Sequence, residues 1–331
     1  MEVASKSETG LFSQSRFRQF LHNYTTQVNT LIALFVLGAI LSFLTPNFLT
    51  ADNLITVLLQ STINSIIAIA ETFVIIAGGI DLAVGATVAF SSTIMGQLVV
   101  HSGLNPFLGI LVAMALGLGA GCVHGLLVTK LNIPPFIVTL GAMTIWRGIA
   151  LEFCRGTVIF GLPKALTWFG ETYLGPMPVA VIFGVGLYFV AWFVLSRTKL
   201  GLYIYAIGGN QQAARLSGIN IDRVKIIIYT ISGFLCAVAA ILITGRINAT
   251  SPNTGMGYEL DAIAAVVIGG TSFAGGEGVI WGSLIGAIIM GVIRNGLNML
   301  NVSPYYQQIV IGLVIVTAVG FDCVRRKRKQ G

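Results

Sequence analysis

The chain is 331 residues long, and 55% of its residues are hydrophobic while only 9% are charged. Ordinary soluble domains are about one quarter charged, and a soluble protein of this length could not bury so much apolar surface. The formal net charge of +7 does not indicate a nucleic-acid partner, because the basic residues lie mainly between apolar segments, as the positive-inside rule expects of cytoplasmic loops.

Apolar segments of about 20 residues have the length that crosses a bilayer as a helix. The sequence contains such segments along most of its length, so we predict an all-α fold, a polytopic membrane helix bundle of ten spans. The predicted spans are Leu31–Phe48, Leu54–Ile76, Leu82–Val100, Phe107–Val128, Phe136–Phe153, Val179–Leu195, Val224–Ile247, Leu260–Phe273, Val279–Leu300 and Tyr305–Val324. The span Leu260–Phe273 is short and ends near glycines, so a re-entrant element is an alternative there.

The distribution of basic residues predicts the orientation of the chain. Most of the 19 lysine and arginine residues lie in the two ends of the chain and in alternate loops, and such residues stay on the cytoplasmic side. We expect a cytoplasmic tail over 1–28, a transmembrane domain over 29–324 and a basic cytoplasmic tail over 325–331, in a bacterial inner membrane. The two large loops are then periplasmic at 154–178 and cytoplasmic at 196–223.

The first interruption of the apolar pattern is the segment GGIDLAVG at 78–85. Two glycines end one helix, and Asp81 stands where the next helix would begin. One interpretation is a tight cytoplasmic turn in which Asp81 accepts a hydrogen bond from the amide of Ala83 or Val84. The alternative is a gate or hinge, because a carboxylate so close to hydrocarbon is costly and is often functional.

The second interruption is the segment YELDAIAAVVIGGTSFAGGEG at 258–278. It resembles the first interruption, with a double glycine and a helix rich in small residues. Similar segments in corresponding places are a mark of duplicated transporter halves, so an internal repeat is a hypothesis.

The third interruption lies in the predicted cytoplasmic loop. Asn210 can cap a two-turn helix through Leu216, and Gly218 can end it. This helix either rests on the membrane surface or docks in a groove of a partner protein. Ala213 and Ala214 are expected to be free of the bundle, because the loop lies outside the membrane.

Polar side chains inside the spans are expensive and indicate packing or a transport path. Gln60, Asn64 and Glu71 share one helical face, which we expect to look into the bundle. Arg147 lies about 16 Å along its helix, at ~1.5 Å per residue, near the middle of the membrane. Its charge requires a carboxylate, carbonyl groups or water.

Four motifs in the same chain resemble the permease subunit of monosaccharide importers of the ATP-binding cassette (ABC) class, and most of all the ribose-type permeases. They are GGIDLAVG at 78–85, AIGGNQQAARLSGIN at 206–220, GYELDAIAAVVIGGTSFAGG at 257–276 and NGLNMLNVSPYYQ at 295–307. Glu71 and Arg294 depart from the pattern of that family, in which an apolar residue and an asparagine are usual. The resemblance implies a homodimer, a cytoplasmic ABC ATPase and a periplasmic sugar-binding protein.

The candidate site residues follow from the resemblance together with the polar positions. Coupling to the ATPase is expected at Asn210, Gln211, Gln212, Ala213, Ala214, Arg215, Leu216, Ser217 and Gly218. The transport path or gate is expected at Gln60, Asn64, Glu71, Asp81, Arg147, Asn295 and Asn298. Contact with the binding protein is expected at Arg155, Lys164 and Arg246.

The chain is not expected to be an enzyme. It contains no Gly-Lys pair and therefore no phosphate-binding P-loop, so ATP and Mg²⁺ would be used by the partner ATPase and this chain needs no cofactor or metal. The alternative function is an ion-coupled secondary transporter, for which Glu71, Arg147 and His124 are the few available polar groups. Ribose is the sugar that the resemblance favours, and allose, galactose and xylose remain alternatives.

Overall fold

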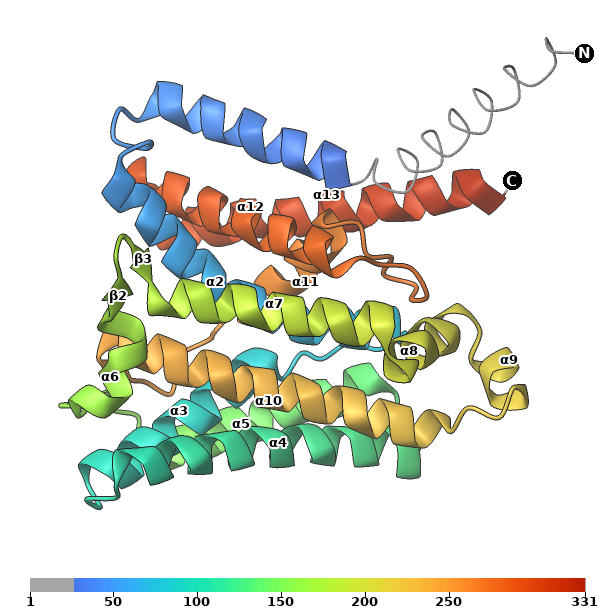
Figure 1. The fold of residues 1–331 in the computed structure, drawn as a ribbon, viewed down its shortest axis with the longest axis horizontal. Helices are drawn as coiled ribbons and strands as arrows, with labels where there is room; N and C mark the ends of the chain where they lie inside the picture. Colours follow the sequence, from blue (N-terminus) through green and yellow to red (C-terminus); the bar gives the residue numbers. More distant parts are fainter. Residues whose placement is uncertain (1–26, 331) are drawn as a thin grey trace, which may run out of the picture.

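The computed structural model describes residues 27–330, with side chains to 324, so most of the predicted N-terminal tail lies outside the described residues. The described chain is almost entirely helical (Figure 1). Its long helices are Gln27–Leu44, α2 (Ala51–Ile76), α4 (Pro106–Lys130), α5 (Pro135–Phe153), α7 (Val179–Arg197), α10 (Ile221–Ile247), α12 (Ile280–Met299) and α13 (Pro304–Gln330). The shorter helices are α3 (Val84–Val100), α6 (Lys164–Glu171), α8 (Lys199–Gly209), α9 (Gln211–Leu216) and α11 (Tyr258–Ile268).

Two of the ten predicted spans are shorter than the sequence suggested. Among the described residues, eight helices are long and apolar enough to cross a membrane, whereas α3 has 17 residues and α11 has 11. A helix the length of α11 covers only about 16 Å of a core that is about 30 Å thick. The prediction of a span at Leu260–Phe273 is therefore wrong, because the chain turns at Gly269 and Gly270 and continues as a loop to α12.

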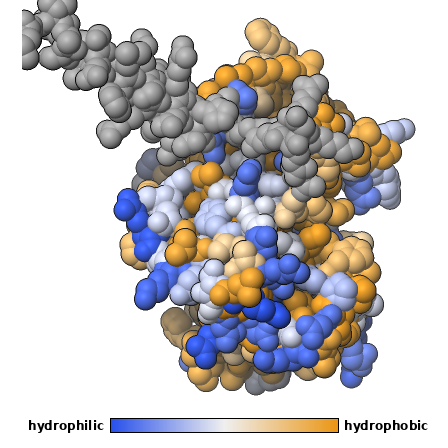
Figure 2. Space-filling view, turned by 90° about the vertical axis from the view of Figure 1, so that its right-hand side faces the viewer, coloured by the Kyte–Doolittle hydropathy of each residue, from blue (hydrophilic) through white to orange (hydrophobic). Residues whose placement is uncertain are grey.

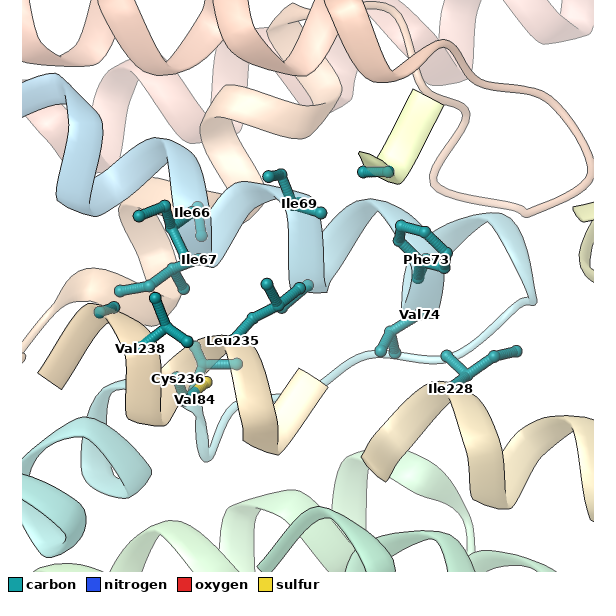
Figure 3. Close-up of a cluster of buried hydrophobic side chains, with 14 of the residues drawn as sticks. Ile66, Ile67, Ile69, Phe73, Val74, Val84, Ile228, Leu235, Cys236 and Val238 are labelled. Atoms are coloured by element: carbon teal, nitrogen blue, oxygen red, sulfur yellow. The ribbon is translucent and has the colours of Figure 1, made fainter. Parts of the chain in front are cut away.

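The core is built on α2 and α10. Their most apolar windows are 67% and 72% buried, against 11% for Gln27–Leu44 and for Pro304–Val324. Figure 3 shows the isoleucines of α2 meeting Leu235, Cys236 and Val238 of α10, with Val84 of α3 below them. These two long helices are thus central, and the first and last helices are peripheral.

Glycines set how closely α4 approaches α10. A Cβ atom on Gly117 or Gly121 would collide with the backbone of Gly233 or Tyr229. Gly125 likewise lies against Ile226. Small residues allow helices in a membrane to bring their backbones together, so these positions explain part of the glycine content.

The contacts between helices repeat within the chain. α10 packs on α3 and α4, and α2 packs in the same way on α11 and α12. Likewise, α3 packs on the two helices that follow it, α4 and α5, and α11 packs on the two that follow it, α12 and α13. α2 and α10 run in opposite directions, since α2 ends beside α8 and α10 begins after α9. The segment α2–α5 therefore corresponds to α10–α13 as an inverted repeat, as the hypothesis of duplicated halves expects. The two glycine pairs do not correspond in it, because Gly78 and Gly79 follow the first helix of one half and Gly269 and Gly270 follow the second helix of the other.

The two ends of the bundle differ. One end carries α8, α9, the start of Gln27–Leu44 and the C-terminal end of α13 (Figure 1); we call it the α9 end. Hydrophilic residues gather over much of this end (Figure 2). The opposite end, the α6 end, carries α6 with strands β1 (Ile159–Phe160), β2 (Tyr173–Leu174), β3 (Met177–Pro178) and β4 (Ala249–Thr250).

Two pairs of short strands connect the loops at the α6 end. β1 pairs with β4 in antiparallel register, which joins the loop after α5 to the loop after α10. β2 and β3 form a hairpin that leads into α7.

Candidate functional site

The capped helix predicted in the loop 196–223 is present as α9. The Asn210 side chain accepts a hydrogen bond from the Ala213 amide at 2.9 Å, and Gly218 takes a left-handed conformation (φ 83°) after the helix. These features confirm the predicted cap and stop. The loop also contains α8, which the sequence analysis did not predict. Its apolar segment is too short to span a membrane, and its apolar side chains pack against the bundle.

The side chains of α9 are divided between the bundle and the exterior. Leu216 is 89% exposed, but Ala214 is only 4% exposed and belongs to the main hydrophobic core. The expectation that Ala214 is free of the bundle is therefore wrong, because the helix lies against α8 and the start of α10. Gln211, Gln212, Ala213, Arg215 and Ser217 are exposed.

Close contacts with the backbone fix α8 to the bundle. The Gly276 amide donates to the Ile76 carbonyl at 2.9 Å, and Gly208 packs against both residues so closely that a side chain could not fit. The Tyr205 hydroxyl donates to the Gly278 carbonyl at 2.8 Å. The glycines of two sequence motifs are thus explained by one packed contact, which joins α8 to the end of α2 and to the loop before α12.

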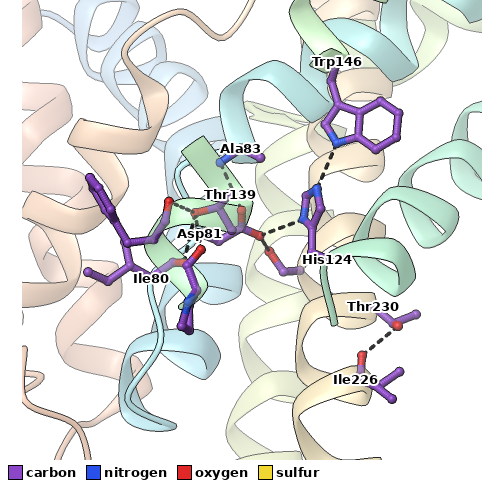
Figure 4. Close-up of polar contacts among 11 residues, drawn as sticks. Ile80, Asp81, Ala83, His124, Thr139, Trp146, Ile226 and Thr230 are labelled. Carbon is purple, nitrogen blue, oxygen red and sulfur yellow. Dashed lines mark hydrogen bonds and ion pairs between the residues drawn. The ribbon is translucent and has the colours of Figure 1, made fainter. Parts of the chain in front are cut away.

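Asp81 is buried at a junction of three helices (Figure 4). Its Oδ1 accepts from the Ala83 amide at 3.0 Å, as predicted, and its Oδ2 accepts from the Ser232 hydroxyl of α10 at 2.8 Å. His124 Nδ1 of α4 lies 3.8 Å from the same Oδ2. Asp81 therefore does more than stabilise a turn, since it connects the segment before α3 to α4 and α10; its role as a gate stays a prediction.

His124 is itself oriented by α5. The Trp146 indole N–H donates to His124 Nε2 at 2.9 Å. Nε2 is then the acceptor of the imidazole, so the proton sits on Nδ1, which faces Asp81. Neither Trp146 nor Ser232 was predicted, because their sequence neighbourhoods are ordinary apolar helix.

A second buried aspartate lies near the start of α11, the short helix that corresponds to α3 in the other half. Asp261, in the first turn of α11, accepts from Arg294 Nε at 2.7 Å and lies 2.6 Å from Arg294 Nη2. Arg294 belongs to α12, which corresponds to the α4 of His124 in the repeat. The sequence showed Arg294 only as a departure from a family pattern, and the structure shows its partner.

Of the three polar residues predicted to look into the bundle from α2, two do so and Gln60 is half-buried. Asn64 and Glu71 are buried, and neither carboxylate oxygen of Glu71 has a hydrogen-bond partner within the described residues. Asn295 and Asn53 exchange amide hydrogen bonds at 2.8 and 3.1 Å, and Asn298 accepts from Gln307 at 2.7 Å. A transport role for Gln60, Asn64, Glu71, Asn295 and Asn298 stays a prediction.

The remaining predicted residues lie toward the α6 end. Arg147 Nη1 donates to the carbonyls of Pro252 at 2.6 Å and Thr254 at 2.8 Å, which supplies the partner that its charge requires. Arg155 and Lys164 are exposed, and Arg246 is half-buried beside Gly170 of α6. The role of these last three in binding a partner is untested.

Comparison with known proteins identifies the family. The family model for the permease component of branched-chain amino acid transport systems matches residues 53–319. The ribose import permease protein RbsC of Escherichia coli K12 is 43% identical over 311 residues, which cover 92% of this chain and 96% of that protein. RbsC of Bacillus subtilis 168 is 45% identical over 293 residues, with 88% and 91% covered.

A relative with a different sugar in its name is also similar. The D-allose transport system permease protein AlsC of Escherichia coli K12 is 38% identical over 320 residues, with 96% of each chain covered. No solved structure matches the chain. The resemblance found in the four motifs is confirmed, and the chain belongs to this family of multi-pass membrane permeases.

Proposed function

We propose that the chain is the membrane-spanning subunit of an ABC importer that moves ribose delivered by a periplasmic binding protein. The observation that carries the proposal is the order of similarity. Relatives named as ribose import permeases are 41–45% identical over most of the chain. Those named for allose, fructose and galactose are 38%, 37% and 36% identical.

The importer works as a homodimer in the bacterial cytoplasmic membrane, with ATP and Mg²⁺ used by a separate ATPase. The α9 end faces the cytoplasm in this arrangement and the α6 end faces the periplasm. The concentration of hydrophilic side chains over the α9 end supports this orientation (Figure 2), as does the basic run at 325–329 beyond the last apolar segment.

The ATPase docks on α9. The helix is short, capped and fixed to the core through Ala214. A displacement of α9 is therefore transmitted to α8 and to the end of α2. Leu216 projects from it as an almost fully exposed apolar side chain. Exposed apolar groups ringed by polar ones suit the centre of a protein interface.

An uptake experiment tests the proposal. Cells without their own ribose permease should accumulate labelled ribose only when this chain is produced with its ATPase and its binding protein. An ATPase variant that cannot hydrolyse ATP should abolish uptake. Uptake that continues without an ATPase and stops with a protonophore would support the ion-coupled alternative, and competition by unlabelled allose or galactose measures the choice of sugar.

A second experiment tests the docking of the ATPase. Leu216→Glu should weaken co-purification of the ATPase and abolish uptake, because a charge would replace the exposed apolar contact. Ser102→Glu is the control, since it adds the same charge to an exposed position in the loop between α3 and α4, outside the predicted docking helix. Normal co-purification and uptake with Leu216→Glu would contradict the docking site.

A further inference from the structure

The segment Ser251–Gly257 enters the interior of the bundle from the α6 end without forming a helix. At its start, Thr250 contacts Gly96 in the last turns of α3, and near its end the Gly255 backbone contacts Gly85 in the first turn of α3. These two contacts lie about 16 Å apart along α3, at ~1.5 Å per residue. The segment therefore reaches a depth at which the surrounding helices cross the hydrocarbon core.

One side of this deep segment is open. Met256 is 74% exposed and Leu260, in the first turn of α11, is 47% exposed. Irregular backbone is not tolerated against lipid, because lipid offers no partner for its amides and carbonyls; such backbone is buried in protein or lines water. The open side therefore does not face the bilayer.

The segment is held in place from two directions. Arg147 of α5 donates to the carbonyls of Pro252 and Thr254, and Glu259 Oε1 accepts from the Gly257 amide at 3.3 Å. Gly255 and Gly257 both have positive φ angles, 74° and 84°, which other residues rarely adopt. The backbone around Met256 is thus fixed in an unusual shape by a charged side chain at depth.

We propose that Ser251–Gly257 lines the aqueous transport path and that Met256 forms its narrow point. The inference rests on the proposed function and assigns a residue to the path. A flexible thioether can pack on the C–H faces of a sugar, and an apolar constriction excludes water when no sugar is present. Arg147 is a positioning residue, because it holds the segment through two carbonyls.

Cysteine labelling tests the assignment. Met256→Cys is made in the full importer after serine replaces Cys122 and Cys323, the native cysteines that are not buried. A charged, membrane-impermeant methanethiosulfonate should modify the introduced thiol and stop ribose uptake. Val190→Cys is the matched control, because Val190 is exposed on the regular helix α7 in mid-span, where lipid would protect the thiol.

Each outcome decides between assignments. A thiol in the Met256→Cys variant that stays unmodified during transport overturns the proposal, as does modification without loss of uptake. The introduced thiols of two copies could instead form a disulfide while remaining inaccessible to the reagent. That result would place the segment in a subunit interface and would also overturn the proposal. Modification is read by mass, so it stays informative even when the unmodified protein takes up no ribose, a result that would refute only the proposed function.

The positioning role has its own readout. Arg147→Gln, which cannot hold both carbonyls as the guanidinium does, should change the rate at which the thiol of the Met256→Cys variant is modified. Glu152→Gln is the control, because Glu152 is exposed on the same helix α5 and its side chain makes no such contact among the described residues. An unchanged rate in Arg147→Gln would remove Arg147 from the assignment.

Discussion

The two halves of the repeat each bury one aspartate beside a short helix, and they stabilise it differently. Asp81 of the first half is held mainly by neutral donors, the Ala83 amide and the Ser232 hydroxyl, with His124 at 3.8 Å. Asp261 of the second half is held directly by the guanidinium of Arg294. Each half thus buries one aspartate near its short helix, and the residue of the third helix that faces it is His124 in one half and Arg294 in the other.

This difference has an energetic consequence. A buried carboxylate that relies on one full charge is left uncompensated when that charge is removed. A carboxylate that is stabilised by several neutral hydrogen-bond donors loses only a part of that stabilisation when one donor is removed. The second half should therefore be the more sensitive to a single substitution.

The helix crossings differ in the same chain. α4 meets α10 backbone to backbone, through Gly121 and its glycine neighbours, whereas Gly291 of α12 meets the Ser61 side chain of α2. A side chain can change rotamer to admit a methyl group and a backbone cannot. The first crossing should be the less tolerant of an added methyl.

The largest effect is expected from Arg294→Met. It leaves the buried Asp261 without its cation, and breaking such a pair costs about 3–5 kcal/mol. The melting temperature of the detergent-solubilised protein should fall sharply, and Asp261→Asn in the same chain should restore much of the loss. A single Arg294→Met variant that melts like the unsubstituted protein would refute the importance of this pair.

An intermediate effect is expected from Gly121→Ala. Overpacking of a tight contact costs about 1–3 kcal/mol, and here the obstacle is backbone. Gly291→Ala should cost less, and Gly119→Ala, which points into open space on α4, should cost least in the same melting experiment. Equal losses for Gly121→Ala and Gly119→Ala would show that the α4–α10 crossing is loose.

The smallest effect on stability is expected from Asp81→Asn. Asparagine can still accept from the Ala83 amide through Oδ1, and its Nδ2 can donate to the Ser232 hydroxyl. Asp81→Ala should cost about 1 kcal/mol or more of local stability through the lost cap. Melting and uptake are measured on the same preparations. If Asp81→Asn folds normally but transports nothing, its charge acts in gating and is more than a structural contact.

The sequence predicted much of the local structure. Asn210 and Gly218 marked both ends of α9, and Asp81 marked the turn before α3, because caps depend on a few adjacent atoms. The polar face of α2 was assigned to the interior from its helical spacing alone. Arg147 was placed deep in the membrane, but its partners are over one hundred residues away in sequence and could not be named.

The length of the apolar segments determined that this chain is a helical membrane protein, since a bilayer requires long apolar helices. Motif order determined its family. Only the tertiary structure decided that α11 stops short, that Arg294 partners Asp261, that Ala214 is buried and that Ser251–Gly257 reaches the membrane interior. Those features depend on which helices meet, and hydrophobicity along one helix carries no information about the backbone that packs against it.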